Sequence, residues 1–219
     1  MITGAIFDLD GTLIDSMAVW DTIGETYLRT LGYEPKEDIN EVLRPLSLYQ
    51  AACYCKSEYG IPMSAEELMA GVNKAVENAY FYSVPAKEGV NDFLSRLSKT
   101  GVKMCVATAT DRYLVEAALR RLELDRYFSD IFTCTEAGCG KEEPAVYRRA
   151  HACLGTDKTK TVVFEDALHA AATARKDGFI TVGVYDRYTE EQEELKRVSD
   201  VYLPDYLHTE AFWDLAGKM

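Results

Sequence analysis

The sequence predicts an α/β fold built on a doubly wound parallel sheet, with a helical insertion near the N-terminus. Short apolar runs that are rich in β-branched residues recur from residue 102 onward, at 102–109, 161–165 and 180–185. Segments with helical periodicity precede or follow them, at 88–100, 111–122, 142–154 and 167–177. Because strands that alternate with helices form right-handed β–α–β units, we expect a parallel sheet covered on both faces.

Three further runs complete the predicted sheet and give a Rossmann-like core. Residues 2–9 form an apolar run that ends before Gly11 and is too short for a typical helix, so we expect a buried first strand there. A shorter strand is expected near 129–133, and residues 201–203 are predicted to add an edge strand.

The alternation of strands and helices is interrupted after the first strand. Long amphipathic patterns without a convincing strand occupy roughly residues 16–31, 37–58 and 64–81. Breaks between these patterns fall at Gly32, at 60–62 and at 83–85. We therefore divide the chain into an α/β core and a helical cap, with residues 1–14 and 84–219 in the core and residues 15–83 in the cap.

Composition and charge limit the class of protein and its partners. The 219 residues are 47% hydrophobic and 27% charged, as in ordinary soluble globular proteins. A formal net charge of −12 disfavours non-specific binding to nucleic acid, whose phosphates would be repelled. The sequence contains no transmembrane stretch or signal-peptide pattern. We therefore expect a cytoplasmic protein that binds neither nucleic acid nor membrane, as a monomer or a weak homodimer.

The most informative motif is Ile-Phe-Asp-Leu-Asp-Gly-Thr at residues 6–12, where the first predicted strand ends. Because side chains alternate across a strand, Asp8 and Asp10 are expected to share a direction, opposite to that of their apolar neighbours. Two acids crowded at a strand end repel each other, and a bound cation would relieve that repulsion. Alone, the motif is also compatible with a surface Asp-Gly turn or a calcium-binding loop.

Later polar residues stand where other predicted strands end or helices begin. Thr108 ends the strand at 102–109, where a hydroxyl that faces a helix N-terminus suits an anion, and Thr110 is expected to cap the following helix. Lys141 lies in a loop that enters a helix. Glu165 and Asp166 close the next strand, and buried strands rarely end in paired acids without a cation or a partner.

These motifs resemble, in order and separation, those of the haloacid dehalogenase-like phosphotransferases, and the resemblance covers nearly the whole chain. The pattern is most similar to the subgroup that contains β-phosphoglucomutase, phosphoglycolate phosphatase and small sugar-phosphate phosphatases. In that family a helical cap is inserted between the first two segments of the core, as residues 15–83 are here.

The resemblance implies a role for each residue of the first motif. Asp8 would attack phosphorus and become an aspartyl phosphate. Asp10 would protonate the leaving alkoxide and then deprotonate the attacking water or hydroxyl. Gly11 would allow the sharp backbone turn, and Thr12 would hold Asp10 in place. An acid at position 10 favours phosphate esters over halogenated substrates, because halide leaves without a proton.

The resemblance also implies groups that bind the substrate. Thr108 would hydrogen-bond the transferring phosphoryl group, with Ala109 beside it, and Lys141 would neutralise the nucleophile and the phosphate. Glu142 stands where the family usually has proline, which puts the local geometry of this loop in question. In the cap, Arg44 is the candidate for substrate binding.

A Mg²⁺ ion is implied as cofactor, since Mg²⁺ prefers hard oxygen ligands and keeps several waters. Its expected ligands are the Asp8 carboxylate, the Asp10 main-chain carbonyl and the Asp166 carboxylate, with Glu165 bound directly or through water.

Together these implications predict a Mg²⁺-dependent phosphatase that hydrolyses a small phosphorylated metabolite, with sugar phosphates as the first expectation. A phosphomutase of the β-phosphoglucomutase kind uses the same residues but returns the phosphoryl group to another hydroxyl, so it stays an alternative. A receiver-like phosphoacceptor domain is disfavoured by the insertion and by Asp10. A non-catalytic binding descendant ranks lower, because all the primary residues are present.

Overall fold

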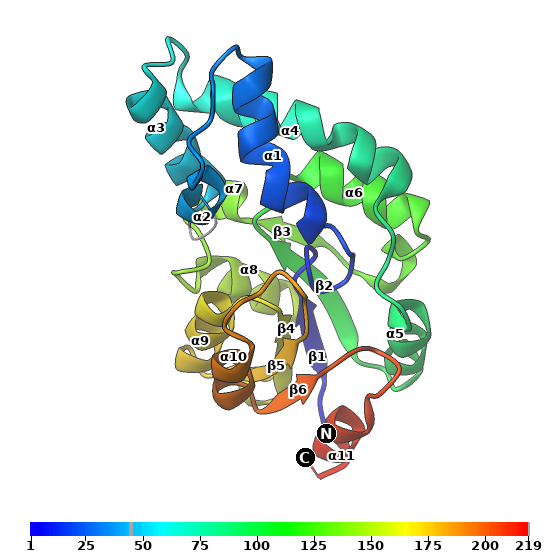
Figure 1. Cartoon of the computed structure of the whole chain (residues 1–219). Helices are drawn as coiled ribbons and strands as arrows, with labels where there is room; N and C mark the ends of the chain where they lie inside the picture. The colour runs from blue at the N-terminus through cyan, green and yellow to red at the C-terminus, as the bar shows by residue number, and fades with distance from the viewer. Residues whose placement is uncertain (44–45, 219) are drawn as a thin grey trace.

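In residues 1–43 and 46–218, which the computed structural model describes, six parallel strands form one sheet in the order β3-β2-β1-β4-β5-β6 (Figure 1). The strands are β1 (Gly4–Phe7), β2 (Lys103–Thr108), β3 (Ile131–Thr133), β4 (Thr161–Glu165), β5 (Ile180–Val184) and β6 (Val201–Leu203). The predicted doubly wound sheet is confirmed. β1 is shorter than the predicted run 2–9, because the chain leaves the sheet after Asp8 to turn at Gly11.

Successive residues of each strand pack on opposite faces of the sheet. On one face, Phe7 of β1 stacks on Phe164 of β4 with ring centroids 4.2 Å apart. Helices that share this hydrophobic cluster are α5 (Val90–Lys99), α6 (Arg112–Arg121) and α11 (Glu210–Lys218). On the other face, Ile6 and Val163 pack with α8 (Ala145–Leu154) and α9 (Leu168–Lys176). The short α7 (Cys134–Ala137) follows β3, and α10 (Gln192–Val198) lies beside β5 and β6.

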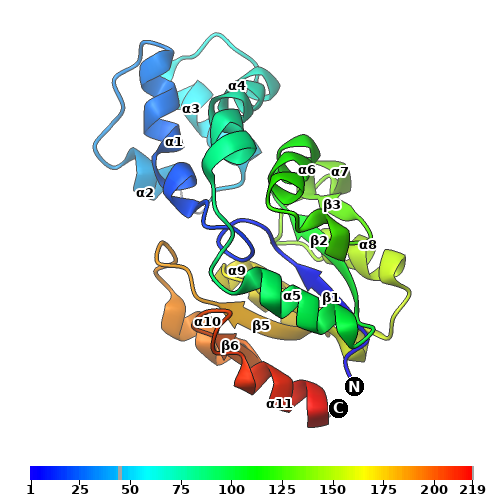
Figure 2. The same cartoon turned by 90° about the vertical axis from the view of Figure 1, so that its right-hand side faces the viewer.

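The helical insertion stands over the carboxyl ends of the strands (Figures 1 and 2). It consists of α1 (Met17–Thr30), α2 (Ile39–Leu43), α3 (Leu48–Tyr59), α4 (Ala65–Asn78) and a π-helical turn, η1 (Ala79–Ser83). Ser47 and Ser64 begin α3 and α4 in reciprocal capping boxes. Leu28, Ile39 and Leu68 belong to a small hydrophobic cluster that these helices bury among themselves. Within the described residues, none of the helices is both long enough and apolar enough to cross a membrane.

The two connections between the sheet and the helical insertion run side by side. The Asp15 amide in the outgoing connection donates to the Pro85 carbonyl in the returning one, with an N···O distance of 2.9 Å. The Arg121 guanidinium of α6 donates to the Tyr80 carbonyl, with an N···O distance of 3.1 Å. This hydrogen bond holds the C-terminal end of the insertion against a helix of the core. The outgoing connection is therefore tied to the returning one, and the end of the insertion is tied to α6 of the core.

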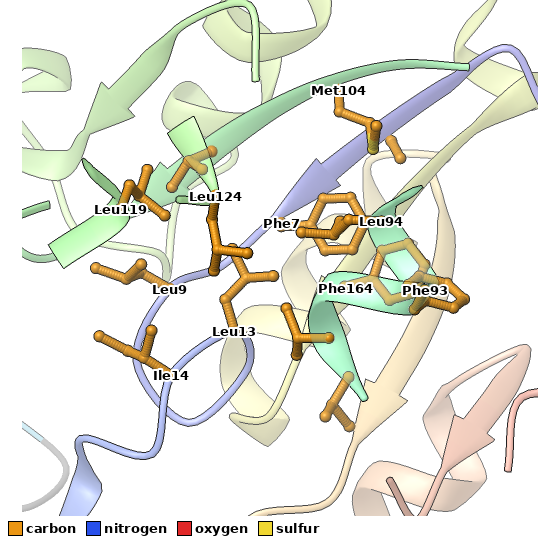
Figure 3. Packing of buried hydrophobic residues seen from close by; sticks show 14 of the residues in the cluster. Phe7, Leu9, Leu13, Ile14, Phe93, Leu94, Met104, Leu119, Leu124 and Phe164 are labelled. Carbon is orange, nitrogen blue, oxygen red and sulfur yellow. The ribbon is translucent and has the colours of Figure 1, made fainter. Parts of the chain in front are cut away.

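The turn that follows β1 is anchored by three apolar side chains. Leu9, Leu13 and Ile14 are fully buried in the same cluster as Phe7 (Figure 3). The amides of Leu13 and Ile14 both donate to the Leu9 carbonyl, at 2.8 and 3.0 Å. This packing fixes the backbone segment that carries the two carboxylates of the first motif.

Candidate active site

Polar side chains from three strands meet at the carboxyl edge of the sheet. β1 and β4 are neighbours, but the chain runs from β1 to β2 on one side and from β4 to β5 on the other. Open α/β sheets bind their ligands at such a switch point. Asp8 follows β1, Thr108 ends β2 and Glu165 ends β4, so the three predicted residues reach the same edge.

Lys141 joins two of the predicted acids in one buried network. Its ammonium group donates to Asp8 Oδ1, and to Glu165 Oε1 at an N···O distance of 2.7 Å. Tyr147 of α8 donates to the same Glu165 oxygen at 2.7 Å. All four side chains are buried. Burial by itself would lower the pKa of Lys141, but the adjacent carboxylates of Asp8 and Glu165 raise it, so the lysine is positively charged.

Burial and mutual repulsion act against the ionised forms of the neighbouring acids. Burial raises the pKa of Asp8 well above its ordinary value, Lys141 lowers it, and the other carboxylates raise it further. Burial likewise raises the pKa of Asp166 to about 7, with Glu165 as the next contributor. The single lysine therefore does not compensate the whole cluster.

The acidic cluster fits a divalent cation. Ligand oxygens of Asp8, Glu165 and Asp166 lie within 4.8 Å of one another. Glu165 Oε2 is buried and has no hydrogen-bond partner among the described residues. Three carboxylates and the Lys141 ammonium leave a formal charge of −2, which a divalent ion balances. Hard carboxylate oxygens are the ligands that Mg²⁺ prefers, so the residues present suit the predicted cofactor.

Gly11 allows the first motif to approach Asp166 closely. Its φ is +76°, and a β-carbon there would lie 2.3 Å from Asp166 Oδ2. The expectation that Thr12 holds Asp10 is wrong, because this turn directs the Thr12 hydroxyl to Asp166 Oδ1, at 3.2 Å. Thr189 donates to the other Asp166 oxygen at 3.4 Å.

Asp10 is held by three hydroxyl groups. Ser16 donates to Oδ1 and Thr110 donates to Oδ2, each at an O···O distance of 2.6 Å. Tyr80 of η1 also donates to Oδ1. The indole Nε1 of Trp20 in turn donates to the Tyr80 hydroxyl at 2.7 Å. Three residues of the insertion, Ser16, Trp20 and Tyr80, thus take part in positioning a predicted catalytic carboxylate.

The loop after β2 brings two threonines to the site. Thr108 is fully buried, and its hydroxyl accepts a hydrogen bond from the Thr110 amide at 3.1 Å. The predicted capping of α6 by Thr110 is wrong, because its hydroxyl binds Asp10 and Asp111 occupies the cap position. Asp111 in turn accepts a hydrogen bond from Asn73 of α4, which links this loop to the insertion.

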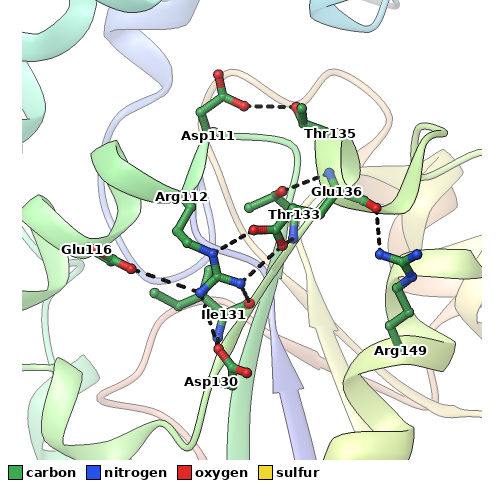
Figure 4. Close-up of polar contacts among 9 residues, drawn as sticks. All are labelled: Asp111, Arg112, Glu116, Asp130, Ile131, Thr133, Thr135, Glu136 and Arg149. Atoms are coloured by element: carbon green, nitrogen blue, oxygen red, sulfur yellow. Dashed lines mark hydrogen bonds and ion pairs between the residues drawn. The ribbon is translucent and has the colours of Figure 1, made fainter.

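A polar cluster at the surface fixes the start of α6 against the end of β3 (Figure 4). Arg112 donates to Glu136 at 2.6 Å and to Asp130 at 3.2 Å. Thr135 donates to Asp111 at 2.8 Å. These contacts hold the backbone that carries the two threonines of the site.

Two predicted substrate-binding residues remain, Ala109 and Arg44, and the structure describes the first of them. Ala109 is exposed and lines a cavity together with Asp10. Arg44 lies outside the described residues. Tyr147 and Ser16 were not predicted as site residues. A tyrosine inside an amphipathic helix commonly packs in the core, and a serine before a helix commonly caps it.

Comparisons with known proteins show the family to which this chain belongs. The family model described as "Haloacid dehalogenase-like hydrolase" matches residues 5–184. Validoxylamine A 7'-phosphate phosphatase from Streptomyces hygroscopicus subsp. limoneus is 29% identical over 217 residues, which are 97% of each chain. The phosphorylated carbohydrates phosphatase of Thermotoga maritima is 24% identical over 173 residues, 79% of this chain and 80% of that protein. Pyrophosphatase PpaX of Bacillus velezensis is 26% identical over 188 residues, 84% of this chain and 83% of its own.

The fold is also found among solved structures. CbbY from Rhodobacter sphaeroides, crystallised in complex with phosphate, superposes with a TM-score of 0.83 at 20% sequence identity. The superposition covers 95% of this chain and 96% of CbbY. With a family model matched over most of its length and phosphatases among its relatives, this chain belongs to the haloacid dehalogenase-like hydrolases.

Proposed function

We propose that the protein is a Mg²⁺-dependent phosphatase that releases inorganic phosphate from a small phosphorylated metabolite through an aspartyl-phosphate intermediate. The convergence of Asp8, Lys141, Glu165 and Asp166 in one buried cluster carries this proposal. Phosphoryl transfer needs a nucleophile, positive charge around three oxygens and a proton for the leaving group. Relatives named as phosphatases, one of them for phosphorylated carbohydrates, support the same reaction class, and sugar phosphates are the substrates expected first from the sequence.

In the first step, a carboxylate oxygen of Asp8 attacks phosphorus and the bond between phosphorus and the ester oxygen breaks. Asp10 gives its proton to the departing oxygen. Lys141 offsets negative charge beside the nucleophile. Thr108 accepts a hydrogen bond from the Thr110 amide, and it directs its own hydroxyl proton to a phosphoryl oxygen.

In the second step, Asp10 takes a proton from water, and the water oxygen attacks phosphorus. The bond between phosphorus and Asp8 breaks, which yields inorganic phosphate and the free carboxylate. Each hydroxyl group around Asp10 can donate or accept a hydrogen bond, so Ser16, Tyr80 and Thr110 suit both protonation states of this acid.

The bound Mg²⁺ would neutralise charge on the phosphoryl oxygens during both steps. Asp8, Asp166 and the main-chain carbonyl of Asp10 would hold it, with Glu165 as a direct or water-mediated ligand. The unpartnered Oε2 of Glu165 supports this assignment.

Residues 15–83 would act as a cap over this site. Their helices stand over the carboxyl edge of the sheet, and Tyr80 and Asn73 reach from the insertion to Asp10 and Asp111. In this role the cap would exclude bulk water and select the organic group of the substrate.

The experiment that tests the proposal is ³¹P NMR of the protein with Mg²⁺ and a panel of phosphate esters. We expect inorganic phosphate to accumulate from at least one ester, to stop with excess EDTA, and to resume when Mg²⁺ is restored. Asp8→Asn should abolish turnover, whereas Asp214→Asn, at an exposed position of α11, should not change it. Normal activity of Asp8→Asn would overturn the mechanism. A new ester resonance without net phosphate would identify a phosphomutase instead.

A further inference from the structure

A cavity of about 310 Å³ opens beside Asp10 and extends between the helices of the insertion. Asp10, Ala109 and Thr110 line its end at the sheet, and residues of α1, α2, α3 and α4 line most of the rest, together with Tyr188 of the core. This volume lies at the lower end of the range for small-molecule pockets, roughly 300–1,000 Å³. The cavity is therefore large enough for an organic group and is continuous with the proposed site of chemistry.

The walls between the helices are mainly aliphatic. They include Ile23 and Leu28 of α1, Leu43 of α2, Leu48 of α3 and Leu68 of α4. No lysine, arginine or histidine is among the described residues that line the cavity. A lining of this kind stabilises apolar groups through burial.

Several of the polar side chains on the lining are already committed to hydrogen bonds within the protein. Asn73 donates to Asp111, and Asn40 donates to Glu25 at 3.4 Å. The Ser47 hydroxyl is used in the capping box of α3. A sugar would bury several hydroxyl groups here, and each hydroxyl without a partner costs free energy. Asp21, Tyr27 and Tyr188 also line the cavity, but aliphatic side chains form most of its wall, so the lining disfavours a polyhydroxylated organic group.

We propose that the substrate is a phosphate monoester whose organic group is predominantly apolar and occupies this cavity. The proposal rests on the proposed function. Because Asp10 donates the proton to the ester oxygen, the group attached to that oxygen extends from Asp10, and the cavity begins at Asp10. The hydrolysis keeps the balance given above: water and the monoester yield an apolar alcohol and inorganic phosphate.

A series of n-alkyl phosphates from ethyl to decyl, compared with glucose 6-phosphate, tests this substrate class. We expect kcat/KM to rise by about fourfold for each methylene group that the cavity buries, and then to level off. Hexyl phosphate, with as many carbon atoms as glucose 6-phosphate, should be the better substrate by at least tenfold. A preference for glucose 6-phosphate, or no dependence on chain length, would overturn the proposal.

A variant that fills the cavity tests whether the alkyl group of the substrate binds there. Ala51 of α3 lines the cavity, so Ala51→Phe should reduce the preference for octyl over ethyl phosphate by tenfold or more. Ala70 of α4 is exposed and is not part of the lining, so Ala70→Phe is the matched control and should keep the preference of the unmodified protein. An unchanged preference in Ala51→Phe would place the alkyl group elsewhere and contradict the proposal.

Binding of esters to the Asp8→Asn variant, which should not turn them over, tests the substrate class independently of the proposed mechanism. By calorimetry with Mg²⁺ present, we expect hexyl phosphate to bind more tightly than glucose 6-phosphate, with a larger negative heat-capacity change. If that result holds but the unmodified protein releases no phosphate from any ester, the phosphatase mechanism is wrong and the cavity assignment stands. If esters are hydrolysed but glucose 6-phosphate binds more tightly, the cavity assignment is wrong and the mechanism stands.

Discussion

The two ends of the cavity are built from different kinds of interaction. At the sheet edge the cavity ends at Asp10, and next to this residue in the chain the carboxylate of Asp8 is buried with Glu165, Asp166 and Lys141. Between the helices, the walls are mainly aliphatic and recognise a shape rather than a charge. Chemistry and selectivity are therefore expected to reside in separate parts of the molecule. Substitutions at the sheet edge should slow every ester, whereas substitutions between the helices should change which ester is preferred.

Among these substitutions, Lys141→Met is expected to have the largest effect, and it tests whether the sheet edge acts on every ester alike. It leaves Asp8 and Glu165 buried without their shared cation. We expect kcat to fall by about 10²–10³ for every ester, and the free energy of unfolding to fall by about 3–5 kcal/mol, as for a broken buried ion pair. Steady-state kinetics and urea unfolding measure both quantities.

Lys99→Met, at an exposed position of α5, is the control and should leave both quantities unchanged. If Lys141→Met slowed long-chain esters but not short ones, the division between chemistry and selectivity would fail.

Asp10→Asn should affect fewer esters than Lys141→Met, because its effect depends on the leaving group. An alkoxide needs a proton as it departs, so alkyl phosphates should lose about 10²–10⁴ in kcat. p-Nitrophenolate leaves without a proton, so p-nitrophenyl phosphate should lose much less in its first step. Burst kinetics resolve that step from the hydrolysis of the intermediate. Equal losses in the first step for both esters would rule out proton donation by this residue.

The stability of the metal-free protein should depend on pH through Asp166. Burial raises the pKa of this carboxyl to about 7, so the folded protein holds a proton that the unfolded chain has lost above about pH 4. The free energy of unfolding should therefore fall as the pH rises from about 4 to about 7, with ~4 kcal/mol at most from Asp166 and a further fall from Asp8, whose pKa is also raised. Because Mg²⁺ binds ionised carboxylates, its stabilising effect should grow over the same window.

Urea unfolding at several pH values, in EDTA and in Mg²⁺, measures this dependence. Asp166→Asn cannot titrate, so its metal-free stability should be flatter between pH 4 and pH 7. A slope equal to that of the unmodified protein would assign the titration to another group.

Much of the sheet and of its polar edge could be predicted from the sequence, because local patterns encode them. Apolar runs with β-branched residues mark the strands, and polar residues at their ends mark the edge where ligands bind. Asp8, Thr108 and Glu165 were found in this way, and the structure brings them to the same edge.

Partnerships between distant segments could not be predicted from local patterns. Thr110 follows a strand and precedes a helix, so a capping role was the local expectation, whereas its partner Asp10 lies 100 residues away. Tyr80 and Tyr147 are apolar in most of their surface and occur in helical segments, so their spacing is that of core residues. Only the folded chain pairs their hydroxyl groups with acidic residues of the candidate site, Asp10 and Glu165.

Tyr80→Phe should have the smallest effect. It tests the contact between the insertion and Asp10 at the sheet edge. Tyr80 belongs to the π-helical turn η1, a geometry that is frequent at functional sites, and its hydroxyl links Trp20 to Asp10. Losing one of the hydrogen bonds that position Asp10, worth about 1.5 kcal/mol, should reduce kcat for alkyl phosphates by about tenfold. The first step with p-nitrophenyl phosphate should change little, since it does not need the proton of Asp10. Tyr82→Phe, in the same turn but 76% exposed, should leave both esters unaffected. If Tyr80→Phe slowed the first step of both esters equally, Tyr80 would act on the fold of the insertion rather than on the position of Asp10.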